Sequence, residues 1–141
     1  MAITPTREQF SAFAHHDREG EVVMLNLLHF AESEPDDGAE SSSPSSGKVA
    51  YRDYSEDVVR MVESRGGRVV WTGQPEQVLI GDDVSDGWDL VVLVSYPSRS
   101  AFIDMVTSPN YNESHTKRER GLDRTVLLAC RPMANMVASD G

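Results

Sequence analysis

Three side chains with complementary chemistry recur at helical spacing near the C-terminal end of the chain. Tyr111, His115 and Arg118 occupy positions i, i+4 and i+7, so a helix would place them on one stripe. A phenol, an imidazole and a guanidinium can orient an anionic or enolate-like substrate, exchange a proton with it and neutralise its charge. Histidine ordinarily titrates closest to neutral pH, so His115 is the predicted catalytic acid or base. The alternative is an amphipathic helix whose polar side chains, Lys117 and Arg120 among them, only face solvent.

Two further polar residues stand where a polar side chain needs an explanation. Asn26 lies inside an apolar run, on the strand face that carries Met24 and Leu28. A buried amide must find hydrogen-bond partners, so Asn26 either orients a ligand or is a satisfied core amide. Arg99 falls in the first turn of a predicted helix, where a cation opposes the helix dipole. A carboxylate partner or a bound ligand would explain it.

Aromatic residues complete the predicted site. Tyr54 faces inward from a helix, either within the core or with its hydroxyl in a cavity, and Trp71 either walls a pocket or packs in the core or a dimer interface. His29, near the end of a strand on the opposite face from Asn26, is interpreted as a rim histidine or a proton-transfer group. The predicted substrate-binding residues are Asn26, Tyr54, Trp71, Arg99, Tyr111 and Arg118.

Metal and organic cofactors are not expected. The histidines, at positions 15, 16, 29 and 115, do not form a metal-binding spacing, and Cys130 is the one cysteine. The sequence contains neither a phosphate-binding glycine loop nor a GxSxG nucleophile motif. The sequence therefore predicts no metal site, no disulfide framework and no hydrolase triad.

Length and charge restrict the classes of partner. The chain has 141 residues, which suits one domain, and a formal net charge of −10. This charge argues against binding to nucleic acid or to an anionic membrane, since both need a basic surface. No apolar run approaches the ~20 residues of a membrane span, and the N-terminal residues lack the apolar core of a signal peptide. We therefore expect a cytoplasmic protein.

The elements that must position the candidate residues follow from hydrophobic periodicity. Residues 1–19 form a predicted helical extension, capped by Thr4 with Pro5 at the first helical position. Residues 31–48 are acidic and serine-rich, which predicts a flexible loop. Residues 132–141 form a tail that is either loose or packed on a neighbour. The intervening domain spans residues 20–131. Its predicted strands are 21–30, 68–73 with a resumption at 77–80, 88–96 and 124–131. Its predicted helices are 49–64 and, between the last two strands, two helices separated by Ser108-Pro109.

This order predicts an α+β fold of the ferredoxin-like βαββαβ type, an antiparallel sheet with helices on one face. Such strands usually alternate apolar and polar residues, but here both faces are apolar; Val23, Leu25 and Leu27 lie opposite Met24 and Leu28. Helices in so short a chain can cover only one face. The sequence therefore predicts a homodimer whose sheets pack face to face as a dimeric α/β barrel.

Several motifs occur in an order that is similar to one known family. The segments EVVMLNLLHF, SRGGRVVWTGQPEQVLIG, WDLVVLVSYPSRSAFIDMV and SPNYNESHTKRERGL resemble domain of unknown function 1330, within the dimeric α/β-barrel superfamily. The resemblance covers about residues 20–131, and the insert at 31–48 looks longer than usual. It implies a ferredoxin-like subunit and a barrel-forming dimer. It implies no established activity, because superfamily relatives include cofactor-free monooxygenases, isomerases, cyclases, haem-binding enzymes and ligand-sensing modules.

Three functional hypotheses follow. The first is a cofactor-independent enzyme, with monooxygenase-, isomerase- or cyclase-like acid–base chemistry by His115 on a small, partly apolar substrate. The second is a non-catalytic small-ligand-binding or stress-associated module that uses the same pocket. The third is a scaffold dimer that binds a protein partner.

Overall fold

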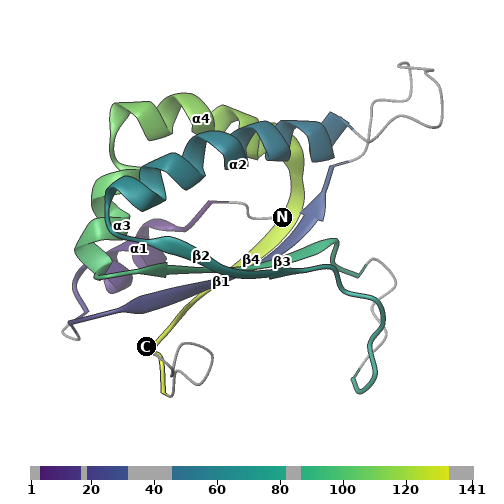
Figure 1. Cartoon of the computed structure of the whole chain (residues 1–141), viewed down its shortest axis with the longest axis horizontal. Helices are drawn as coiled ribbons and strands as arrows, with labels where there is room; N and C mark the ends of the chain where they lie inside the picture. Colours follow the sequence, from purple (N-terminus) through teal and green to yellow (C-terminus); the bar gives the residue numbers. More distant parts are fainter. Residues whose placement is uncertain (1–3, 17–18, 32–45, 82–86, 134–141) are drawn as a thin grey trace.

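The structure is a computed structural model that describes residues 4–16, 19–31, 46–81 and 87–133. Strands and helices follow one another in the order that the sequence periodicity predicts (Figure 1). The elements are α1 (Arg7–Ala14), β1 (Val22–Phe30), α2 (Ser46–Ser64), β2 (Arg68–Gly73), β3 (Leu90–Tyr96), α3 (Arg99–Val106), α4 (Pro109–Gly121) and β4 (Leu122–Cys130).

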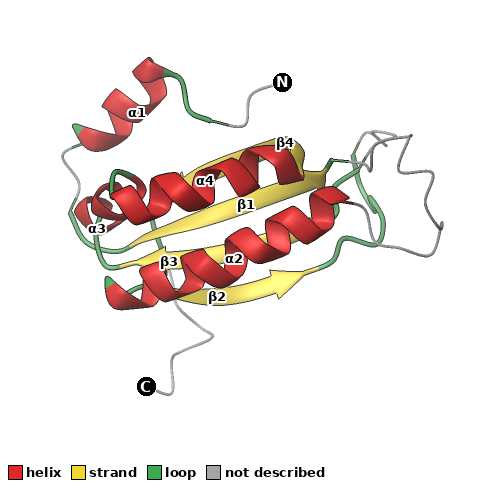
Figure 2. Cartoon of the chain, turned by 90° about the horizontal axis from the view of Figure 1, so that it is seen from above, coloured by secondary structure: helices red, strands yellow, loops and turns green. Residues whose placement is uncertain are grey.

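The four strands form one antiparallel sheet in the order β2-β3-β1-β4. Helices α2 and α4 lie side by side across one face of this sheet, α4 above β1 and β4 and α2 above β3 and β2 (Figure 2). The strand order and the one-sided helices confirm the predicted α+β, ferredoxin-like subunit.

The core lies between the helices and the sheet. Val22, Met24 and Leu28 of β1 point toward the helices and are almost completely buried. They occupy alternate positions of the strand, as residues that share one face of a sheet must. The helical side chains that close this core from α2 are Tyr51, Tyr54, Val58 and Val62.

The other face of the sheet is apolar, and none of the described helices covers it (Figure 1). Leu25 of β1 lies between Leu93 of β3 and Leu128 of β4, and Trp71 of β2 lies beyond Leu93. Trp71 and Leu128 keep 54% and 50% of their surface exposed. We call this surface the open face; its apolar residues are Val23, Leu25, Leu27, Trp71, Val91, Leu93, Val126 and Leu128.

Local capping corrects one predicted boundary. Helix α1 begins at Arg7 and is capped by Thr6, so the prediction of Thr4 as cap with Pro5 at the first position was wrong. The Thr6 hydroxyl accepts a hydrogen bond from the Gln9 backbone N–H, and the Gln9 side chain accepts one from the Thr6 N–H. This reciprocal pair satisfies two of the free amides at a helix start.

Two other predicted segments differ or fall outside the structure. Residues 77–80 do not resume a strand, because the chain leaves the sheet after Gly73. Most of the acidic loop predicted at 31–48, and the tail from 134 onward, lie outside the described residues.

Candidate functional site

Two tyrosine hydroxyls meet in the interior between α2 and α4. The Oη atoms of Tyr54 and Tyr111 are 2.8 Å apart, and the rings cross edge to face with centroids separated by 6.0 Å. Ser108 fixes the position of Tyr111 because it caps α4 and its hydroxyl accepts a hydrogen bond from the Tyr111 backbone N–H. Both hydroxyls can donate or accept, so the pair forms a small polar centre in an apolar core.

Two further tyrosines, Tyr51 and Tyr96, are buried near this pair, and burial raises the pKa values of the phenols. The Tyr51 ring lies 5.3 Å from that of Tyr54, and burial raises the pKa of Tyr51 to about 12. Burial, followed by the neighbouring Tyr111 and Tyr51, raises the pKa of Tyr54 well above its usual range. Burial likewise raises the pKa of Tyr96, which ends β3. These phenols therefore act as hydrogen-bond donors near neutral pH rather than as bases.

A cation is buried beside the phenols. Arg118 keeps only 8% of its surface exposed, and its charge partly offsets the rise in the pKa of Tyr51 and of Tyr54. The end of α4 comes this close to α2 because residue 121 is glycine. A Cβ on Gly121 would lie 2.8 Å from the Gly47 carbonyl oxygen, closer than side-chain atoms normally come. The phenols and the guanidinium together can bind an anionic oxygen.

His115 adjoins this centre from the solvent side. Its ring centroid is 5.7 Å from that of Tyr111, and its Nδ1 is 3.8 Å from a carboxylate oxygen of Glu119. The imidazole is 27% exposed, so it contacts both the buried ring and solvent. We name Tyr51, Tyr54, Tyr111, His115 and Arg118 the tyrosine–arginine site.

Asn26 lies on the core face of β1, as its position in the run predicts. Its amide nitrogen donates to two backbone carbonyls, Met24 O at 3.3 Å and Val92 O at 3.2 Å. Both donors of the amide group are thus used within the sheet. These hydrogen bonds match the second of the two interpretations of Asn26, in which its amide is satisfied within the protein and does not orient a ligand.

Two predicted site residues lie elsewhere in the fold. Arg99 donates from Nη1 to the Phe13 carbonyl oxygen at 3.3 Å, and its guanidinium lies 4.5 Å from the Phe13 ring centroid. It therefore binds the end of α1. Trp71 is on the open face, across the sheet from the tyrosines. The structure brings Tyr54, Tyr111, His115 and Arg118 together and places Arg99 and Trp71 elsewhere. Asn26 lies on the core face of β1.

An ion pair joins the two helices next to the site. Lys117 Nζ lies 2.9 Å from Asp57 Oδ2, and the Ser114 hydroxyl donates to the same oxygen at 3.0 Å. These hydrogen bonds hold the pKa of Asp57 below its usual value. Lys117 is thus part of the α2–α4 contact, and the interpretation of this residue as only solvent-facing was wrong.

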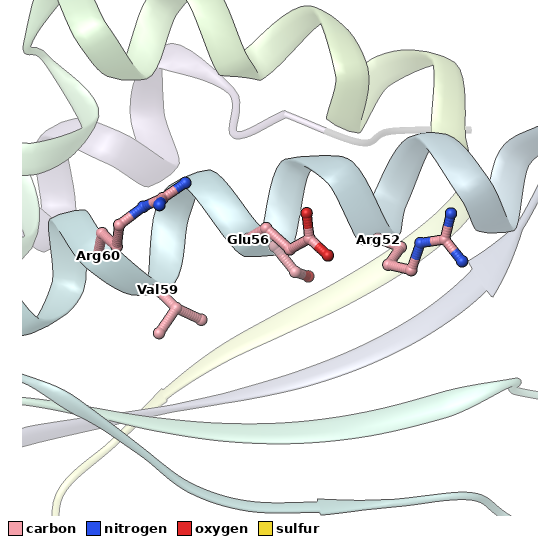
Figure 3. A pocket seen from close by; sticks show the side chains of 5 residues that line it. Arg52, Glu56, Val59 and Arg60 are labelled. Atoms are coloured by element: carbon pink, nitrogen blue, oxygen red, sulfur yellow. The ribbon is translucent and has the colours of Figure 1, made fainter.

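A groove of about 480 Å³ runs along the outer side of α2 (Figure 3). The residues that line it are Arg52, Ser55, Glu56, Val59 and Arg60. None of them is a predicted site residue, and the core-facing residues Tyr51 and Tyr54 lie on a different side of the helix. The groove therefore lies on a different side of α2 from the tyrosine–arginine site, although Ser55, which lines it, is hydrogen-bonded to Tyr51.

The described ranges hold neither a metal-ligand cluster nor a membrane-spanning helix. No group of three or more metal-ligating side chains there could hold an ion. No helix in those ranges is long and apolar enough to cross a membrane.

Tyr96 is buried near Tyr51 and Tyr111, and the sequence did not single it out. Strand alternation could have identified it, because Tyr96 lies on the same face of β3 as Val94 and Val92, which pack against the core. The contact between Arg124 and Trp88 was also not predicted from the sequence. The Arg124 guanidinium stacks on the Trp88 ring, 4.4 Å from its centroid. Only the three-dimensional arrangement brings that pair together.

The sheet order and helix placement define an α+β protein with a ferredoxin-like subunit. A family model described as domain of unknown function 1330 matches residues 45–130. The chain belongs to this family, which confirms the resemblance seen in the sequence. None of the curated proteins matches the chain significantly.

Solved structures agree with this assignment. A protein of unknown function from Rhodopseudomonas palustris is 35% identical, with a TM-score of 0.82 over 94% of this chain and 98% of that one. An Arabidopsis thaliana protein is 13% identical, with a TM-score of 0.53 over 82% and 99% of the two chains. A Caulobacter crescentus protein, provisionally described as an antibiotic biosynthesis monooxygenase, is 14% identical, with a TM-score of 0.52 over 82% and 92%. The last two similarities concern the fold alone.

Proposed function

We propose that this protein binds a small, partly apolar molecule with an anionic or enolisable oxygen at the tyrosine–arginine site. The observation that carries the proposal is the 2.8 Å contact between the buried hydroxyls of Tyr54 and Tyr111 beside the buried charge of Arg118. Phenols that stay protonated donate hydrogen bonds, and a guanidinium neutralises negative charge. Together they favour an oxyanion over a neutral carbonyl oxygen.

The catalytic form of this proposal is a cofactor-independent enzyme. Stabilising an enolate or phenolate lowers the barrier to removing the adjacent proton, which is the first step of many isomerisations, cyclisations and oxygenations. His115 contacts both the Tyr111 ring and solvent, so it is placed to pass a proton between the site and water. Trp71 and Arg99, expected as substrate-binding residues, have no part in this proposal.

The non-catalytic form is a small-ligand-binding or stress-associated module. The position of His115 favours this form. Its Nδ1 lies 3.8 Å from the Glu119 carboxylate on the same helix, so this nitrogen is directed along the surface of α4 and not toward the buried hydroxyls. In this form the same phenols and Arg118 hold the ligand without transferring a proton. The cytoplasmic location expected from the sequence applies to both forms.

A homodimer is the second part of the proposal. The open face groups eight apolar side chains, and Trp71 and Leu128 are about half exposed in a single chain. Covering apolar surface contributes about 25 cal/mol per Å², and a two-fold dimer covers the same face on both copies. The expected arrangement is sheet against sheet, with the helices outside.

Product analysis tests the catalytic form. Purified protein is incubated in air with small phenols and enolisable ketones, and the products are separated and weighed by mass spectrometry. A product that has gained one oxygen atom and lost two hydrogen atoms indicates oxygenation, because the substrate itself then supplies the electrons that reduce the second oxygen atom to water. An unchanged mass with altered retention indicates isomerisation. Activity that falls at least about tenfold in Tyr111→Phe and in His115→Ala, both still folded, supports the assigned roles. Unchanged turnover in His115→Ala removes His115 from the mechanism.

Calorimetric titration tests binding when no product forms. The same phenols and ketones should bind wild-type protein and lose affinity in Tyr111→Phe, whereas Thr116→Val, on the exposed side of α4, should leave affinity unchanged. If none of the compounds binds, the tyrosines serve only the core. Sedimentation at micromolar concentration tests the dimer: wild-type protein should be dimeric and Leu93→Asp monomeric.

A further inference from the structure

The chain between β2 and β3 carries an exposed apolar tip. All of residues 74–81 are exposed, and we call this segment the arm. Val78, Leu79 and Ile80 keep 48%, 83% and 91% of their surface exposed. The arm leaves the end of β2 and extends away from the helices, on the side of the open face (Figure 1). Scattered exposed apolar residues are ordinary, but three in succession on one projecting segment indicate a contact surface.

The return of the chain to β3 is firmly attached to the sheet. Arg124 of β4 donates from Nη2 to the Gly87 carbonyl oxygen at 2.7 Å and stacks on the Trp88 ring. The Asp89 carboxylate accepts a hydrogen bond from the Phe30 backbone N–H at 2.8 Å, and the Asp89 N–H donates to the Leu28 carbonyl oxygen. The chain therefore returns to a fixed point at the end of β1 and the start of β4.

The start of the arm is continuous with the open face. The Trp71 ring lies over Gly73, where a Cβ would collide with it, so the chain passes directly beneath the indole as it leaves β2. Trp71 is also the open-face neighbour of Leu93. One apolar surface thus extends from the centre of the sheet through Trp71 to the arm.

The area of the open face indicates what the arm adds. Four strands about 4.8 Å apart and about seven residues long present roughly 450 Å² in projection. Stable interfaces bury about 800 Å² per partner. The sheet supplies part of such an interface, and a segment that projects past it adds to the buried area.

We propose that the arm docks on a second copy of this chain and clasps that copy beside its open face. The inference rests on the proposed face-to-face homodimer and deepens it. In a two-fold dimer each copy contributes one arm and binds the arm of its partner. Leu79 and Ile80 of both copies are therefore buried in the interface. Chains with a formal net charge of −10 repel one another, and the arm has Glu76 as its single charged residue, so its contact is apolar rather than ionic.

The experiment compares two double variants within the arm. Leu79→Ser/Ile80→Ser removes the apolar tip, and Gln74→Ser/Gln77→Ser changes two polar residues of the same segment. Because all four side chains are exposed, both variants should fold, which circular dichroism verifies. Sedimentation over a concentration series should give a dimer dissociation constant at least about tenfold higher for the first variant and unchanged for the second.

A cysteine probe reports on the arm itself. In a Cys130→Ser background, Leu79→Cys should react with a thiol reagent more slowly at high protein concentration than at low concentration. Protection that does not depend on concentration would mean that the arm folds onto its own chain, and it would overturn the proposal. A wild-type dimer that Leu79→Ser/Ile80→Ser leaves equally tight also overturns it, while the sheet dimer survives. A monomeric wild-type protein overturns both.

Discussion

The hydroxyl groups of Tyr54 on α2 and Tyr111 on α4 lie 2.8 Å apart in the interior, 57 residues apart in the sequence. Each is the hydrogen-bond partner of the other, and both residues are buried. The pair connects the two helices that cover the sheet and places two polar groups beneath them. Under the proposed function, stability and ligand binding therefore depend on the same contact.

A double-mutant cycle measures this contact. Tyr54→Phe leaves the Tyr111 hydroxyl buried without its partner, which should lower the free energy of unfolding by about 1–3 kcal/mol. Tyr111→Phe should have a similar effect. The double variant removes both polar groups, so its loss should be smaller than the sum of the two single losses. Urea unfolding gives all three values, and Thr116→Val on the exposed side of α4 should change stability by less than about 0.5 kcal/mol. Strictly additive losses would contradict the direct bond.

Alkaline pH should destabilise the fold through the same cluster. Burial raises the pKa of Tyr51 from 10.0 to about 12, so between these values the folded chain holds a proton that the unfolded chain has lost. Stability is fully present below pH 10 and falls as pH rises toward 12, by about 3 kcal/mol for this group. The urea concentration at the unfolding midpoint should fall as pH rises from 10 to 12. In Tyr51→Phe this midpoint should depend less steeply on pH. An equally steep decline in Tyr51→Phe would assign the effect to other groups.

Much of the fold could be predicted from sequence because local signals and burial agreed. Runs such as residues 22–30 are apolar on both faces, and Ser98 and Ser108 mark two helix starts by capping backbone amides. The first helix was misplaced because Thr4 and Thr6 are equally good caps by type. Only Thr6 has Gln9 three residues later to complete the reciprocal pair.

The candidate site could be predicted only in part, because spacing along one helix shows a stripe and not what the stripe contacts. The stripe of Tyr111, His115 and Arg118 exists, but its innermost contact comes from Tyr54 on another helix. Arg99 was expected to have a carboxylate partner or a bound ligand, but its guanidinium contacts a backbone carbonyl oxygen and an aromatic ring of Phe13. This contact with the end of α1 is one that no local pattern around Arg99 could reveal.

The ion pair between α2 and α4 should contribute modestly and only above acidic pH. Hydrogen bonds from Lys117 and Ser114 lower the pKa of Asp57 below 3.8, so its contribution is present above that value and is lost as pH falls through the folded pKa. Because the Asp57 side chain is 32% exposed, solvent screening limits the effect of Asp57→Asn near neutral pH to less than about 1 kcal/mol. The difference from wild type should vanish in acid. Glu56→Gln, on the exposed side of the same helix, should show no such pH dependence, and an acid-insensitive Asp57→Asn defect would point to packing instead.

Arg99 should control the attachment of α1 more than the stability of the domain. Helix α1 has no buried residue, and its contacts run through Phe13, which meets the Arg99 guanidinium and lies edge-on to Phe102 at 5.4 Å. Arg99→Met keeps the apolar stem but removes the hydrogen bond to the Phe13 carbonyl oxygen and the cation–π contact. Amide exchange in residues 10–15 should therefore accelerate severalfold, while the free energy of global unfolding changes by no more than about 1 kcal/mol.

Hydrogen exchange followed by mass spectrometry separates these two effects, because peptides from α1 report local opening and peptides from β1 report global unfolding. Arg52→Met, at an exposed position of α2, is the matched control and should alter neither. Equal acceleration in α1 and β1 would show that Arg99 supports the whole domain. An unchanged α1 would show that the Phe13–Phe102 contact alone holds the helix.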